Sequence, residues 1–141
     1  MAYASQSDIE TAAGGAVRLV ELADWDADGV ADATAIAAVQ AATDGWIDSY
    51  AAVRYAVPVA SPTDTLIQVA AEECVYRLRQ RRGMASEGDE QRHKEREAWL
   101  VHLSKGLVRP SDPAPAKSDA VRAEVCVNNR DVSREKLKGF I

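Results

Sequence analysis

Glycine and proline residues divide the first 106 residues of this 141-residue chain into segments of helical length. Gly14 and Gly15 end the first segment, Pro58 ends a longer one, and Gly83 and Gly106 follow the last two. Such residues terminate helices because glycine readily adopts left-handed backbone angles and proline lacks an amide hydrogen. Between these breaks, apolar residues recur every three or four positions. The pattern predicts an all-α bundle of about five helices, two short and three long, with short connections.

Polar residues at the start of each segment predict where the helices begin. Ser7 and Glu10 have the spacing of a capping box. Asp32 precedes the first long helix, and Ser61 precedes Pro62, which suits the first helical position of the second. The predicted helices are residues 8–13, 16–23, 33–57, 62–82 and 90–104.

The composition changes after Gly106, so residues 1–106 are predicted to form a helical domain and residues 107–141 an extended arm. Residues 109–116 are rich in proline and are expected to form a linker that cannot join a core. Residues 123–127 alternate weakly, as in a short strand. The last nine residues are basic and contain large apolar side chains, which is typical of a peptide that docks on a partner. The predicted partner-binding residues are Arg134, Lys136, Lys138, Phe140 and Ile141.

Charge and composition disfavour several classes of function. The net charge of −5 and the sequence pI of about 5.0 count against a small helical DNA-binding protein, because such a surface repels the phosphate backbone. No apolar run is long enough to cross a bilayer, and the first residues lack the basic start and apolar stretch of a signal peptide. We therefore expect a protein made in a cytoplasm. Cys74 and Cys126 lie far apart and are expected to be free thiols.

An acidic loop, residues 24–32, resembles a calcium-binding loop. Asp24, Asp26 and Asp28 occupy alternate positions that supply oxygen ligands, Gly29 permits the turn, and Asp32 falls at the ninth position. The twelfth position, which should hold a glutamate, is alanine. Two interpretations stay open: a calcium site formed by these four aspartates, or a solvated acidic turn in which Asp32 caps the next helix.

The sequence contains no convincing catalytic constellation, so neither an enzyme nor a resident cofactor is predicted. His93 lies among charged residues and is expected on a solvated helix face. Glu72 and Glu73 are adjacent and should point in different directions on a helix. Arg54 ends an apolar helix and is expected to pair with Asp44 or Asp48. The arginines at 77, 79, 81 and 82 suit a helix C-terminus, or contact with an acidic neighbouring subunit or a phosphate.

Several stretches occur in an order that resembles a head-completion protein family of Mu-like tailed phages and prophages. They are Met1-Ala2-Tyr3-Ala4 with Asp8-Ile9, Leu22-Ala23-Asp24 leading into the acidic loop, Ile47-Asp48-Ser49-Tyr50, and Arg54-Tyr55-Ala56-Val57-Pro58. The shared order covers roughly residues 1–106, and Ser133-Arg134 and Lys138-Gly139-Phe140 also resemble the family's ending.

The resemblance implies a helical adaptor at the head–tail junction of a virion, assembled in the host cytoplasm and without enzymatic activity. Such proteins bind the portal after DNA is packaged and form a ring that follows its twelve-fold symmetry. The ring provides the docking surface for the tail or the next neck protein, and DNA passes through its channel without specific binding. The alternative is a calcium-binding helical interaction module that uses the acidic loop.

Overall fold

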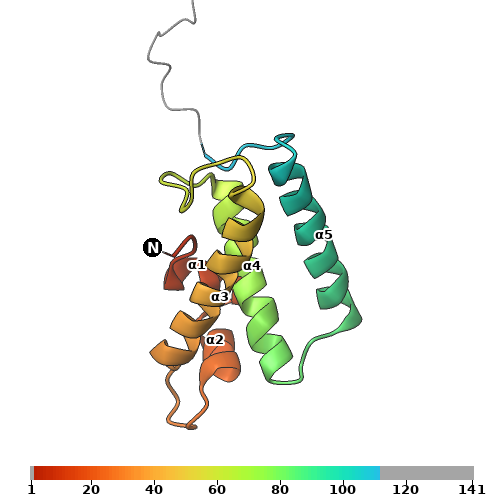
Figure 1. Cartoon of the computed structure of the whole chain (residues 1–141). Coiled ribbons are helices and arrows are strands. Elements are labelled where there is room, and N and C mark those ends of the chain that lie inside the picture. Colours follow the sequence, from red (N-terminus) through yellow and green to blue (C-terminus); the bar gives the residue numbers. More distant parts are fainter. Residues whose placement is uncertain (1, 112–141) are drawn as a thin grey trace, which may run out of the picture.

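The computed structural model describes residues 2–111 as a bundle of five α-helices (Figure 1). These residues contain no β-strand, so the predicted all-α class is confirmed. The strand predicted at residues 123–127 lies outside the described part of the chain. The helices are α1 (Gln6–Ala13), α2 (Ala16–Ala23), α3 (Ala33–Ala51), α4 (Asp64–Arg81) and α5 (Glu87–Ser104).

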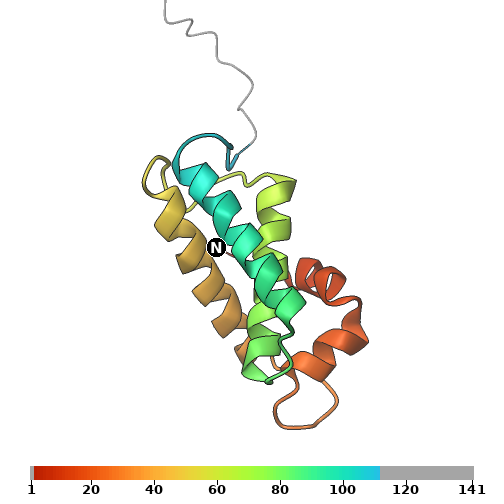
Figure 2. The same ribbon diagram turned by 90° about the vertical axis from the view of Figure 1, so that its right-hand side faces the viewer.

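Helix α4 is the centre of the bundle and contacts all four of the other helices. The long helices α3, α4 and α5 pack on one another, and the two short helices lie together beside α4 (Figure 2). The core forms where these helices meet. Its fully buried large side chains come from every helix and include Ile9, Leu19, Ile47, Leu66, Leu78, Leu100 and Leu103. Each such side chain contributes about 1.5–3 kcal/mol relative to exposure, which makes their burial the main source of stability.

Three helices begin at residues other than the predicted ones. The N-cap of α1 is Ser5, whose hydroxyl accepts a hydrogen bond from the Asp8 amide while the Asp8 carboxylate accepts one from the Ser5 amide. The prediction of Ser7 with Glu10 is therefore wrong. Helix α4 is capped by Thr63 instead of Ser61, and α5 starts before Glu90 because Ser86 forms a second capping box.

Helix α3 ends at Ala51, well before Pro58, which was the predicted stop. Beyond Ala51 the backbone turns, and the amides of Arg54 and Tyr55 both donate to the Ala51 carbonyl. Val59 then returns to the core with 7% of its surface exposed. Its amide donates to the Tyr3 hydroxyl at 2.9 Å, so a side chain near the N-terminus fixes the connection to α4.

Tyr3 joins the N-terminal segment to α3, and its ionisation is expected to lower the stability of the fold at alkaline pH. Its amide donates to Asp44 at 3.1 Å and its hydroxyl donates to Asp48. Burial and the hydrogen bond to Asp48 raise the pKa of Tyr3 from 10.0 to about 12. Since the folded pKa exceeds the unfolded one, this contribution to stability is complete below pH 10 and is lost as the pH rises towards 12.

We therefore expect Tyr3→Phe to remove part of the alkaline loss of stability. Urea unfolding at pH 9, 10 and 11 should give a free energy of unfolding that falls more steeply for the natural chain than for the variant. Tyr55→Phe is the matched control, because that tyrosine donates to the Val108 carbonyl at 3.1 Å instead of to a carboxylate. Parallel curves for the natural chain and Tyr3→Phe would contradict this assignment.

Residues that follow Gly106 also pack against the bundle, although no described residue beyond Ser104 is helical. Pro110 is fully buried and its carbonyl accepts a hydrogen bond from the Thr63 amide at 3.0 Å. Ser111 forms an isolated antiparallel bridge with Pro62. The expectation that the proline-rich linker cannot join a core is thus wrong for residues 109–111, while the rest of the linker lies beyond the described residues.

Arg54 holds this C-terminal turn in place. Its guanidinium donates to the Lys105 carbonyl at 2.6 Å, so the predicted pairing with Asp44 or Asp48 is wrong. Both aspartates are instead acceptors for Tyr3. Gly106 has φ = +74°, and a Cβ atom at this position would collide with the Arg54 guanidinium. The positive φ favours glycine in this turn, and any other residue would also require the Arg54 guanidinium to shift.

Candidate functional site

The acidic loop connects α2 to α3 and brings three aspartates together. One carboxylate oxygen each from Asp24, Asp26 and Asp28 lies within 4.8 Å of the others. These carboxylates also accept hydrogen bonds from backbone amides of the loop, including that of Gly29, which donates to Asp24 at 3.0 Å. The described geometry is thus an Asx-type turn with three converging oxygens that a hard cation could use.

Asp32 is separate from this cluster. Its carboxylate accepts a hydrogen bond from the Trp25 amide at 2.9 Å, and its side chain makes no capping bond to α3 although it occupies the N-cap position. Neither sequence interpretation therefore describes Asp32 fully. The Asp32 amide donates to the Ala23 carbonyl at 3.0 Å, so the residue closes the base of the loop.

The carboxylates and backbone amides of the loop shift the pKa values of two of its aspartates in opposite directions. Desolvation and the nearby carboxylates of Asp28 and Asp32 raise the pKa of Asp26, against the effect of the Asp28 amide. Asp24 behaves in the opposite way: desolvation would raise its pKa, but hydrogen bonds from the Gly29, Asp28 and Ala27 amides lower it overall.

Arg82 fastens the loop to the end of α4. Its guanidinium donates to the Leu22 carbonyl at 3.3 Å and to the Asp24 carbonyl, and it lies 4.8 Å from the centre of the Trp25 ring. The half-exposed Trp25 and the arginine thus form a cation–π pair at the surface. This contact gives Arg82 a structural role, which sequence reasoning did not assign beyond the end of the helix.

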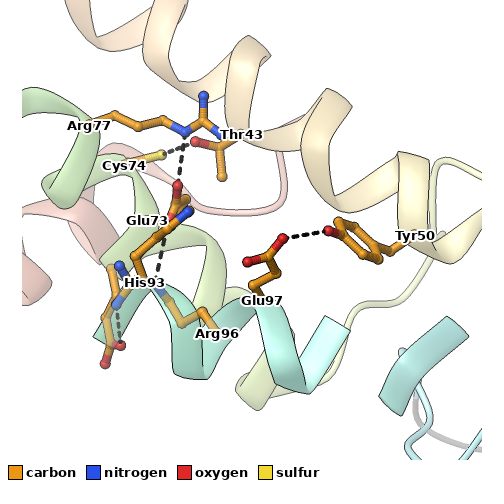
Figure 3. A network of polar contacts seen from close by, with 9 residues as sticks. Thr43, Tyr50, Glu73, Cys74, Arg77, His93, Arg96 and Glu97 are labelled. Carbon is orange, nitrogen blue, oxygen red and sulfur yellow. Dashed lines mark hydrogen bonds and ion pairs between the residues drawn. The ribbon is translucent and has the colours of Figure 1, made fainter. Parts of the chain in front are cut away.

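A buried carboxylate joins α4 to α5 (Figure 3). Glu73 is fully buried, and its two oxygens accept from Arg77 Nε at 3.1 Å and from Arg96 Nε at 3.1 Å, while His93 Nδ1 lies 2.9 Å from one of them. Arg96 is itself 7% exposed. A buried charge must be paired to be tolerated, and Glu73 has three partners on two helices.

His93 is not on a solvated helix face, so that prediction is wrong. Its ring stacks between Trp46 of α3 and Tyr76 of α4, with centroid distances of 5.3 and 4.8 Å. Aromatic residues from three helices and the Glu73 ion pairs therefore form one interface. The contact between Tyr50 and Glu97, at 3.0 Å, adds a further hydrogen bond from α3 to α5.

The solvent-exposed side of α3 consists of small residues. Small residues recur every three or four positions along it, which places them on one face of the helix, and all of them are exposed. Gly45 lies within this face, with nothing within 4 Å of where a Cβ would stand. We call this surface the small-residue face of α3; it consists of Thr34, Ala38, Ala41, Gly45, Ser49 and Ala52.

The described residues thus define a small all-helical protein whose buried ionic groups join helices and whose α3 has an exposed face of small residues. Residues 3–128 match the family model of bacteriophage Mu Gp36, and the chain belongs to this family. The match includes the whole described bundle and continues beyond it. A search of curated proteins found no match. Family membership indicates a bacteriophage protein with a structural or assembly role.

Two further predictions can be placed against the structure. Within residues 2–111, none of the helices is both long and apolar enough to span a membrane. Cys74 is buried, and its thiol lies 3.4 Å from the Thr43 hydroxyl. Cys126 and the predicted partner-binding residues, from Arg134 to Ile141, lie outside the described range, so the structure gives no position for them.

Proposed function

We propose that this chain is a head-completion adaptor of the phage neck, a structural subunit without catalytic activity. It would bind the portal after DNA packaging, form a ring and provide the docking surface for the tail or the next neck protein. The observation that carries the proposal is the Gp36 family match over residues 3–128, together with the head-completion resemblance of the sequence motifs.

The small-residue face of α3 supports ring formation. Small side chains allow a neighbouring helix to approach closely, since helix axes separate by 8–10 Å depending on the side chains at the contact. Alanine also loses no side-chain entropy on burial. Side-by-side subunits in a ring need two complementary surfaces, and this face would serve as one of them.

The charges support passage of DNA without adhesion. The net charge of −5 makes the chain a poor ligand for phosphates, and the acidic loop projects from the end of the bundle between α2 and α3 (Figure 1). A ring of such subunits would repel the DNA backbone from its channel wall. The arm residues Arg134, Lys136, Lys138, Phe140 and Ile141 would make the contacts to the portal or the neck.

A phage from which this gene is deleted tests the proposal. Electron microscopy of the lysate should show heads that have packaged DNA, separate tails and few joined particles, because only the joining surface is missing. Expression of the natural chain in trans should restore tailed particles. Joined, infectious particles in the absence of the chain would overturn the proposal.

A calcium-binding module is the second candidate, favoured by the convergence of Asp24, Asp26 and Asp28. If the site forms, calcium at one hundred times its Kd should stabilise the protein by about 2.7 kcal/mol. Asp26→Ala should abolish this shift in Tm, whereas Glu90→Ala, which removes an exposed carboxylate of α5, should retain it. Equal Tm values with chelator and with millimolar calcium would remove this candidate.

A further inference from the structure

A groove between α1 and α4 has no role in the proposed contacts. Its volume is about 490 Å³, and residues of α1 and α4 line it. Ala12, Ile67 and Ala71 contribute apolar surface to it. The remaining lining residues are polar or acidic: Asp8, Thr11, Asp64, Gln68 and Glu72.

The charged residues that line this groove are all carboxylates. Asp8 stands on its α1 side, and Asp64 and Glu72 stand on its α4 side. Hydrogen bonds from the Ser5 side chain and amide lower the pKa of Asp8, which keeps it charged at neutral pH. Within residues 2–111, Glu72 is the only one of these three carboxylates that forms an ion pair, with Arg96 at 3.6 Å. The groove is therefore suited to a peptide that carries both cations and large apolar side chains.

We propose that residues 133–141 of the same chain occupy this groove in the free protein. This segment carries three cations and one carboxylate side chain, together with the large apolar residues Leu137, Phe140 and Ile141. Residues 112–132, in contrast, carry three cations and four carboxylates. The positive charge that complements the groove is thus concentrated in the segment that also has the apolar anchors.

The path of the chain permits this contact. Ser111 pairs with Pro62, next to the start of α4 at Asp64, and Asp64 is part of the groove. The intervening residues 112–132 can extend to roughly 70 Å at about 3.4 Å per residue. A tether of this kind gives an effective concentration in the millimolar range, which favours the chain's own segment over a second copy. Docking would also keep Phe140 and Ile141 from water before a partner binds.

Paramagnetic relaxation in the full-length chain tests the proposal. A nitroxide is attached at Gly139→Cys in a Cys126→Ser background; Cys74, which is buried and has its pKa raised to about 11 chiefly by burial, stays unlabelled. Amides of Thr11, Ile67 and Gln68 should lose most of their intensity, and those of Ala38 and Ala41 should keep it. Added salt should weaken the effect, because screening reduces the attraction between charges.

A matched pair of variants separates docking from general charge effects. Gln68 and Gln91 are both exposed and both donate to a glutamate one turn later, Glu72 and Glu95. Gln68→Lys should restore much of the lost amide intensity in α1 and α4, whereas Gln91→Lys should leave the broadening unchanged. Lys136→Glu with Lys138→Glu should abolish it.

Three results would overturn the proposal: no broadening, broadening spread over all helices, or broadening that appears only when the nitroxide and the observed isotope are in different copies. The last result would identify a second copy as the occupant. The measurement uses no portal and no tail, so the proposed neck function can stand or fail independently of it.

Discussion

Glu73→Gln is expected to lower the free energy of unfolding by about 3–5 kcal/mol, the usual cost of removing one member of a buried ion pair. The variant keeps the shape of the side chain but leaves the guanidinium groups of Arg77 and Arg96 without their shared counter-charge. The energetic cost is expected to be larger at Arg96 than at Arg77, because only 7% of the Arg96 side chain is exposed to water. Urea unfolding followed by circular dichroism measures this loss, and Tm should fall by roughly 15 °C or more.

The neighbouring residue provides the control. Glu72 also contacts Arg96, at 3.6 Å, but its side chain is 40% exposed. Exposed ion pairs contribute about 0–1 kcal/mol, so Glu72→Gln should change stability little. The two variants differ in burial and not in chemistry. Equal losses for Glu72→Gln and Glu73→Gln would show that burial of the ion pair does not determine its contribution.

Ala41→Arg should weaken ring assembly while leaving the monomer folded. The change places a long, charged side chain in the middle of the small-residue face of α3, where a neighbouring subunit is proposed to pack. Alanine and arginine are both good helix formers, so the stability of the monomer should change by less than about 0.5 kcal/mol. We expect assembly to weaken at least tenfold, which corresponds to about 1.4 kcal/mol.

Ala98→Arg is the matched control for this prediction. Ala98 is an exposed alanine within α5, so the substitution adds the same charge and bulk on a different helix. Sedimentation velocity of each variant with purified portal would show whether the ring forms. Normal rings with Ala41→Arg, or equal loss with Ala98→Arg, would exclude the small-residue face as the subunit contact.

The number of helices could be predicted from the sequence because a glycine that ends a helix does so through its own backbone angles and does not depend on distant contacts. Gly14, Gly83 and Gly106 all have positive φ angles and follow the last turn of a helix, as expected. Helix starts were less accurate. Ser5 and Thr63 cap α1 and α4, whereas Ser7 and Ser61 lie two residues away and were equally plausible caps. Ser86 caps α5 four residues before the predicted start at Glu90.

Part of the buried ionic network had a signal in the sequence. Glu73 lies two turns after Leu66 on the buried stripe of α4, and Arg77 follows one turn later. A carboxylate on an apolar stripe requires a partner, so its pairing with Arg77 could have been expected. The partners on α5 could not be predicted, because the register of α5 against α4 depends on packing between distant residues. For the same reason His93 could not be placed between Trp46 and Tyr76.

The most direct measurement is cryo-electron microscopy of the neck in intact phage particles that contain this protein. We expect a ring of five-helix subunits between portal and tail, with α3 of each subunit against its neighbour and an open channel along the axis. A neck that lacks this density, or subunits that touch neither portal nor tail, would contradict the proposed role as a head-completion adaptor.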